Sequence, residues 1–178
     1  MESRRVERLS GKSSALTLRP SRARTIEHGF ATIARFFPGA GEVLGGIDDE
    51  VLGALAPPAA PGKAACFEDQ YASTGGQLYE LMAGHDRFIA DLRPLIRPNS
   101  MRRNSPAPLC CHPYDICTAL LAETLGVRLT GADGGPLDAP FSLDANVAWV
   151  GYANRELQAA VEPVLQRALM RRGLLPAR

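Results

Sequence analysis

Residues 109–126 concentrate the side chains of this chain that could take part in chemistry. Three thiols and an imidazole stand close together there, and they could bind Zn²⁺ or form a cysteine–histidine pair: Cys110, Cys111, His112 and Cys117. Zinc ligands, however, are usually separated by about two to four residues, adjacent cysteines point in different directions, and sequence neighbours rarely form a catalytic pair. We therefore interpret these thiols as small buried hydrophobic residues, with a zinc site as the weaker alternative.

Asp115 is the carboxylate of the same segment, and its position predicts a capping role. Pro113 favours the first turn of a helix, and Gly126 favours the position just after the last turn. Between them, apolar residues recur at helical spacing, namely Ile116, Ala119 and Leu120. A carboxylate in the first turn meets the positive end of the helix dipole. Taken alone, Asp115 is therefore interpreted as a helix-capping acid.

Three segments carry longer motifs in a fixed order. Residues 73–88 read Ser-Thr-Gly-Gly-Gln-Leu-Tyr-Glu-Leu-Met-Ala-Gly-His-Asp-Arg-Phe, residues 113–126 read Pro-Tyr-Asp-Ile-Cys-Thr-Ala-Leu-Leu-Ala-Glu-Thr-Leu-Gly, and residues 133–138 read Asp-Gly-Gly-Pro-Leu-Asp. They resemble, in turn, the Gly-Ser/Thr-Ala-Ala…Ala-x-Gly-x-x-Asp-x-Tyr segment, the Trp-Asp-x-Ala-Ala-Gly…Glu-Ala-Gly-Gly signature and the Asp-x-x-Gly-x-Pro-x-Asp turn of the inositol monophosphatase family. The resemblance runs from about residue 65 to the end and corresponds to the C-terminal half of such an enzyme.

The resemblance implies both a fold and a set of site residues. The fold class is α/β, a layered sheet with flanking helices like the C-terminal part of the αβαβα inositol monophosphatase fold. The activity implied is Mg²⁺-dependent hydrolysis of a phosphate monoester resembling inositol phosphate. Asp115 corresponds to a magnesium ligand at a helix start. Ser73 and Thr74 correspond to the pair that approaches the substrate, and Asp91 lies near the acidic residue that contacts substrate hydroxyls.

Other motifs of that family are missing from this sequence. Neither Gly-Glu-Glu nor Asp-Pro-x-Asp-Gly-Thr occurs, and these motifs supply the general base and most metal ligands. The nearest acidic group, at residues 48–50, is interpreted as a solvated helix face. One carboxylate cannot hold a two-metal centre, so we assign no catalytic residue and expect no activity from this chain alone. It would be a truncated half completed by a complementary N-terminal half. The alternative is a non-catalytic structural or anion-binding relative that acts through association.

Composition narrows the class of protein. The chain has 178 residues, 46% of them hydrophobic and 22% charged, with a net charge of +1, which fits one globular domain and gives no argument for nucleic acid or an anionic membrane as partner. No apolar run approaches the ~20 residues of a membrane span, and no signal-peptide region follows Met1. We therefore expect reduced cysteines and a cytoplasmic location. Phosphate-binding loops, dinucleotide fingerprints and nucleophile elbows are absent from the sequence.

The elements that must position these residues alternate between strand and helix patterns. Strands are predicted at residues 15–19, 25–33, 64–68, 87–92, 127–130 and 146–152. Helices are predicted at residues 42–56, 74–83 and 113–126 and after Asn154. Such alternation predicts a single α/β domain at residues 25–178, with a mobile loop at 93–109. Residues 1–24 are basic and are expected to form a disordered tail.

A chain corresponding to half of a larger fold would leave an apolar sheet face or edge uncovered. For this reason we expect a homo-oligomer, unless a complementary N-terminal half covers that surface.

Overall fold

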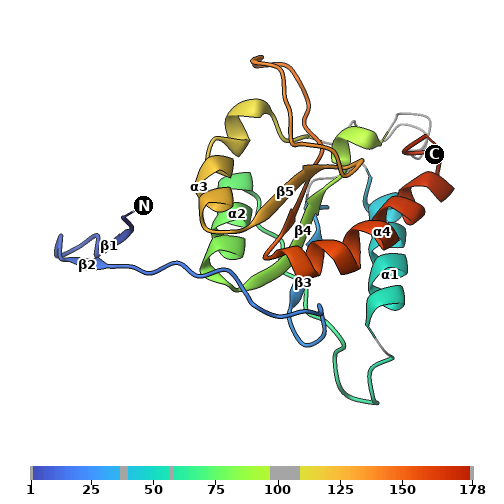
Figure 1. The fold of residues 1–178 in the computed structure, drawn as a ribbon, viewed down its shortest axis with the longest axis horizontal. Coiled ribbons are helices and arrows are strands. Elements are labelled where there is room, and N and C mark those ends of the chain that lie inside the picture. The colour runs from blue at the N-terminus through green and yellow to red at the C-terminus, as the bar shows by residue number, and fades with distance from the viewer. Residues whose placement is uncertain (1, 37–39, 57, 97–108, 177–178) are drawn as a thin grey trace.

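The computed structural model describes residues 2–36, 40–56, 58–96 and 109–176. A four-stranded sheet lies between two pairs of helices (Figure 1). The sheet order is β3-β4-β6-β5, with the strands spanning Phe30–Ile33, Asp86–Asp91, Trp149–Tyr152 and Arg128–Gly131. The helices are α1 (Gly41–Leu55), α2 (Thr74–Ala83), α3 (Ala119–Thr124) and α4 (Arg155–Arg171). The predicted α/β class and layered arrangement are confirmed.

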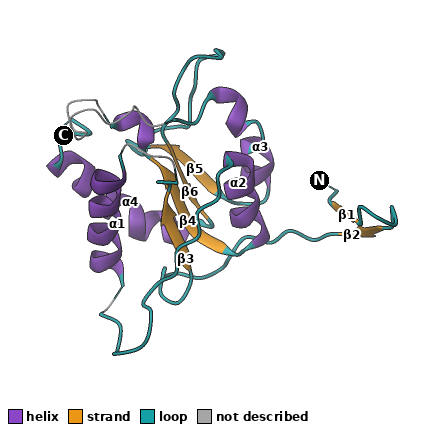
Figure 2. Ribbon diagram, turned by 180° about the vertical axis from the view of Figure 1, so that it is seen from behind, coloured by secondary structure: helices purple, strands orange, loops and turns teal. Residues whose placement is uncertain are grey.

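Helices cover both faces of the sheet. α1 and α4 pack on one face, and α2 and α3 pack on the other (Figure 2). β3 and β4 are parallel, whereas β6 is antiparallel to both β4 and β5. An uncovered sheet face is therefore not found in the part of the chain that the structure describes. At the β3 edge, Phe30 and Phe67 remain partly exposed, with their ring centroids 5.7 Å apart.

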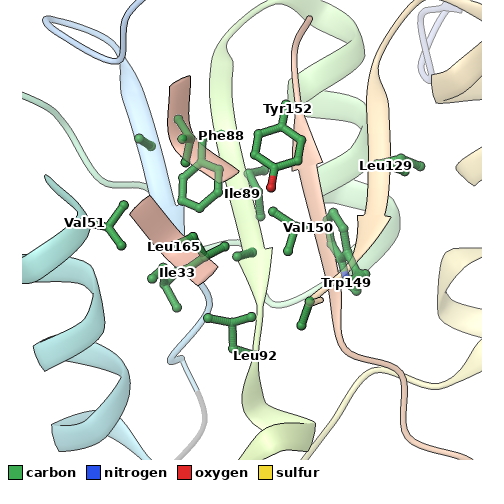
Figure 3. Packing of buried hydrophobic residues seen from close by; sticks show 14 of the residues in the cluster. Ile33, Val51, Phe88, Ile89, Leu92, Leu129, Trp149, Val150, Tyr152 and Leu165 are labelled. Carbon is green, nitrogen blue, oxygen red and sulfur yellow. The ribbon is translucent and has the colours of Figure 1, made fainter. Parts of the chain in front are cut away.

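The core lies where the sheet meets the two helix layers. All four residues of β6 are buried, as expected for a strand covered on both faces. Figure 3 shows Phe88 beside Tyr152, and Val51 of α1 and Leu165 of α4 near Ile33. No helix within the described ranges is both long and apolar enough to cross a membrane.

Local signals place α2 and α4 where the sequence predicts them. The Oγ of Ser73 accepts a hydrogen bond from the backbone N–H of Gly76 (3.2 Å), which caps α2. Gly84 ends this helix with φ of 83°, a conformation that favours glycine. The Oδ1 of Asn154 likewise accepts from the N–H of Leu157 (2.9 Å) and caps α4.

Several predicted elements are wrong in extent. The strands predicted at 25–33 and 146–152 are shortened to β3 and β6. The strand predicted at 64–68 contributes only an isolated bridge between Phe67 and Phe30. The predicted 15–19 strand is replaced by β2 (Ser13–Ala15), which pairs with β1 (Arg4–Val6) in an exposed hairpin away from the sheet. The helix predicted at 113–126 divides into the 3-10 helix η3 (Pro113–Ile116) and α3. Only Ala122 of α3 is buried, so packing contributes little to extending that helix.

Disorder of the tail at 1–24 and mobility of the loop at 93–109 stay predictions. Within that loop, Arg93–Leu95 forms the short 3-10 helix η1. Residues 97–108 lie outside the described residues.

Candidate functional site

A cavity of about 420 Å³ opens beside the N-terminus of α2 and the residues that follow β4. Its walls come from segments far apart in the sequence: Phe36, residues 72–75, Arg93, residues 109–112 and the pair Tyr114 and Asp115. Phe36 follows β3 and Arg93 follows β4, and these strands are parallel. The cavity therefore lies at the carboxyl ends of two parallel strands, where open α/β sheets commonly bind ligands.

Three of the four predicted site residues line this cavity together. Ser73 and Thr74 contribute from the start of α2, and Asp115 contributes from η3. The fourth, Asp91, is fully buried at the end of β4 and is not part of the lining. Its neighbour Arg93 reaches the cavity wall instead.

Asp91 and Arg93 form a buried ion pair. The Nε of Arg93 donates to Oδ1 of Asp91 (2.8 Å), Nη2 of Arg93 donates to Oδ2, and the backbone N–H of Arg93 also donates to Oδ1 (3.2 Å). Burial acts to lower the pKa of Arg93, but the hydrogen bond and charge of Asp91 outweigh it, so this pKa is raised. The pair thus keeps a charged guanidinium inside the wall of the cavity.

Two further contacts hold Arg93 in place. Its Nη1 donates to the carbonyl oxygen of Leu109, and its Cζ lies 4.7 Å from the ring centroid of Phe36. Arg93 therefore links β4 to two other parts of the wall. From the sequence, Arg93 is predicted to lie in a solvated loop, with a contact between the arginines of that loop and phosphate near Asp115 as the weaker alternative. The signal that could have found it is the Asp-x-Arg spacing at the end of a strand.

Asp115 caps its own turn. Its Oδ2 accepts from the backbone N–H of His112 (2.9 Å) and lies 3.4 Å from the imidazole Nδ1 of His112. The His112 ring stacks on Tyr114, with centroids 5.1 Å apart and planes 4° from parallel. The capping interpretation of Asp115 is confirmed for η3, while its carboxylate still faces the cavity.

Of the three cysteines interpreted as small buried hydrophobic residues, Cys111 is buried and Cys110 is half-buried, but Cys117 is exposed, so the interpretation is wrong for Cys117. Burial raises the pKa of Cys110, and it raises the pKa of Cys111 to about 12. Both side chains are therefore protonated at neutral pH, a state that disfavours nucleophilic attack. Within the described ranges, no group of three or more His, Cys, Asp or Glu side chains could hold a metal ion. The zinc alternative gains no support.

Magnesium requires several oxygen ligands, commonly carboxylates and water. Among the described residues that line the cavity, Asp115 is the one carboxylate. The nearby thiols are soft ligands that suit other metals better. The described residues thus do not fit a magnesium site on their own.

Of residues 48–50, only Asp49 is exposed as the predicted solvated face requires. Asp48 is buried, and its Oδ2 accepts from Nη1 of Arg35 at 2.9 Å. Glu50 pairs with Arg171 and Arg172 of α4. The prediction is wrong for Asp48 and Glu50 because their carboxylates join α1 to two neighbouring segments.

Comparison with known proteins places this fold. No protein-family model and no curated protein matches the sequence. An inositol monophosphatase from Anabaena (Nostoc) sp. PCC 7120 superimposes with a TM-score of 0.52 at 14% identity over 96% of this chain and 54% of that one. SaIMPase-II with bound 2′AMP superimposes with a TM-score of 0.50 at 12% identity over 93% of this chain and 54% of that one. The chain therefore has the fold of inositol monophosphatase structures over about half of their length.

Proposed function

We propose that this chain provides the phosphate-binding wall of a phosphate monoester site. The observation that carries the proposal is the meeting of Ser73, Thr74 and Asp115 in one cavity, although about forty residues separate the first two from the third. The likeness to inositol monophosphatase structures supports a phosphate ester as the ligand. An inositol-phosphate-like ester is the finer form of the proposal.

The start of α2 suits an anion. The first backbone N–H groups of a helix have no partner within the helix, and the helix dipole adds positive potential there. Thr74 and Gly75 occupy these first positions and line the cavity. The hydroxyl of Thr74 and the N–H groups of Thr74 and Gly75 would therefore receive the phosphate oxygens.

The Asp91–Arg93 pair has an indirect role in this proposal. Asp91 is too deeply buried to touch a ligand in the cavity, so we assign it the positioning of Arg93 rather than direct contact. Arg93 in turn forms part of the wall, with its charge balanced by Asp91. This replaces the direct substrate contact that the sequence resemblance implies for Asp91.

Asp115 opposes an anion when no cation is present, because like charges repel. We propose that it contributes one ligand to a magnesium ion whose remaining ligands come from another chain, either a second copy or a complementary N-terminal half. Hydrolysis is accordingly assigned to that assembly and not to this chain alone. The second candidate is a non-catalytic anion-binding protein, which the single carboxylate of the cavity favours.

Calorimetric titration with inorganic phosphate and inositol 1-phosphate tests the binding claim. The wild type should bind both ligands, and Thr74→Val should weaken binding by ~10-fold, as expected for a lost hydrogen bond to a charged group. Thr124→Val is a matched control, because the Thr124 hydroxyl donates to Leu120 within α3 and lies outside the cavity lining. A folded wild type that binds neither ligand would contradict the proposal.

Phosphate release from inositol 1-phosphate separates the two candidates. It should be measured with Mg²⁺ for the purified chain, and again after adding candidate partner chains. Release that requires a partner and is lost in Asp115→Asn favours the completed phosphatase. Binding without release in every mixture favours the anion-binding protein.

A further inference from the structure

A second cavity, of about 280 Å³, adjoins the cavity of about 420 Å³ in which we propose that phosphate binds, here called the phosphate cavity. The lining of the second cavity is mostly apolar, with the hydroxyls of Tyr114 and Ser142 as its oxygen groups. It comes from η3, the following turn and the loop between β5 and β6: Pro113, Tyr114, Cys117, Phe141, Ser142 and Leu143. We call this surface the apolar groove. In Figure 1 the loop between β5 and β6 projects beyond the sheet.

The two cavities meet at Tyr114, which lines both. Its parallel stack on His112 holds the ring as a wall between them, and 54% of Tyr114 remains exposed. On the far side of the groove, Phe141 is fully exposed and Leu143 is 75% exposed. Large apolar side chains that are exposed together beside a polar cavity are typical of a ligand-binding groove.

We propose that the apolar groove receives the apolar ester group of a phosphate monoester whose phosphate lies in the adjoining cavity. This inference rests on the proposed function in its coarser form, a phosphate monoester site, and it replaces the inositol-phosphate-like ester with phosphate esters of aromatic or short aliphatic alcohols. The shared residue Tyr114 joins the two halves of such a ligand. Ligand sites of this kind combine apolar walls with a few polar groups that fix orientation.

The size of the groove favours a small ligand over a second protein. A stable protein interface buries roughly 800 Å² on each partner and uses about twenty or more residues a side. Here the groove has six lining residues and a volume of about 280 Å³, which suits one ring or a short alkyl chain.

The test compares the affinity of the wild type for inorganic phosphate, glycerol 1-phosphate and phenyl phosphate. Burial of the ring should make phenyl phosphate bind ~10-fold more tightly than glycerol 1-phosphate. Phe141→Ala and Leu143→Ala should reduce that preference to ~2-fold or less and leave inorganic phosphate binding unchanged. Leu120→Ala is the matched control, because Leu120 is 72% exposed and Leu143 75% exposed, and Leu120 lines neither cavity.

Each other outcome has a definite meaning. Equal affinity for phenyl and glycerol phosphates, with inorganic phosphate still bound, overturns the inference and leaves the proposed function standing. Failure to bind inorganic phosphate overturns the proposed function and this inference with it. A change of molecular mass by light scattering in Leu143→Ala, with the ester preference intact, identifies a second copy as the occupant and overturns the inference.

Discussion

The guanidinium of Arg93 donates hydrogen bonds to the carboxylate of Asp91, two residues earlier in the chain. Both side chains are buried at the carboxyl end of β4. The two residues are close in sequence, but their pairing affects a segment that is distant in sequence. Arg93 also binds the carbonyl oxygen of Leu109, so the end of a central strand is tied to the segment that carries Asp115. The shape of the cavity therefore depends on a charge pair that need not touch any ligand.

Breaking this pair should be costly. Arg93→Met leaves the Asp91 carboxylate buried without its partner, and we expect the free energy of unfolding to fall by ~3–5 kcal/mol in urea titration. The double variant Asp91→Leu/Arg93→Met should lose less than the sum of its single variants, because no charge is then left alone. Arg167→Met, at an exposed position of α4, is the control and should change stability by at most ~0.5 kcal/mol. An Arg93→Met variant as stable as the control would show that the pair is not needed.

Gly151 lies at the centre of β6, where a larger residue has no room. A methyl group there would lie 2.6 Å from Cδ1 of Leu81 and 3.0 Å from Cζ3 of Trp149, and both neighbours are fully buried. Gly151→Ala should therefore lower the free energy of unfolding by ~1–3 kcal/mol.

Gly53→Ala is the matched comparison for that change. Gly53 is exposed in α1, with nothing within 4 Å of an added methyl group. Gly53→Ala should raise the free energy of unfolding by up to ~1 kcal/mol, because alanine has a higher helix propensity than glycine. Thermal or urea unfolding measures the free energy of unfolding of both variants. A Gly151→Ala protein as stable as Gly53→Ala would mean that the sheet and α2 pack less closely than described.

Asp86 predicts a pH dependence of stability. Burial, and then the negative charges of Glu80 and Asp69, raise the pKa of Asp86 to about 7, against an opposing effect of His85. Its Oδ2 is buried, and the structure gives it no hydrogen-bond partner among the described residues. The folded chain therefore holds a proton that the unfolded chain releases between about pH 4 and pH 7.

The direction in which stability changes with pH follows from this difference in bound protons. The stabilising contribution of protonated Asp86 is complete below the unfolded pKa and is lost as the pH rises towards 7, by at most ~4 kcal/mol. Asp86→Asn should remove that loss, so its stability relative to wild type should increase from pH 5 to pH 8 in urea titrations. Asp49→Asn, at an exposed position of α1, is the control, and its stability relative to wild type should not change over this pH range. Parallel pH profiles for Asp86→Asn and wild type would contradict the assignment.

Local signals account for the elements that the sequence predicts well. The cap at Ser73 and the stop at Gly84 directly flank α2, and the cap at Asn154 directly precedes α4. The meeting of Ser73, Thr74 and Asp115 followed only from the family resemblance, because no local pattern relates segments so far apart.

Tertiary contacts explain what the sequence did not predict. Arg93 becomes part of the cavity because β4 ends beside Leu109, and Asp48 is buried because Arg35 comes from a different segment. The apolar groove was missed for a similar reason. Phe141 and Leu143 belong to a loop without periodicity, and only the fold brings them to Tyr114.

Titration of metal-free protein with inorganic phosphate tests the central claim most directly, using wild type, Thr74→Val and Asp115→Asn. The account predicts that the wild type binds phosphate and that Thr74→Val weakens binding. Asp115→Asn should bind ~3- to 10-fold more tightly, because a negative charge that faces the anion is removed. A folded wild type without phosphate binding, or an affinity that neither substitution changes, would show that this cavity is not the phosphate site.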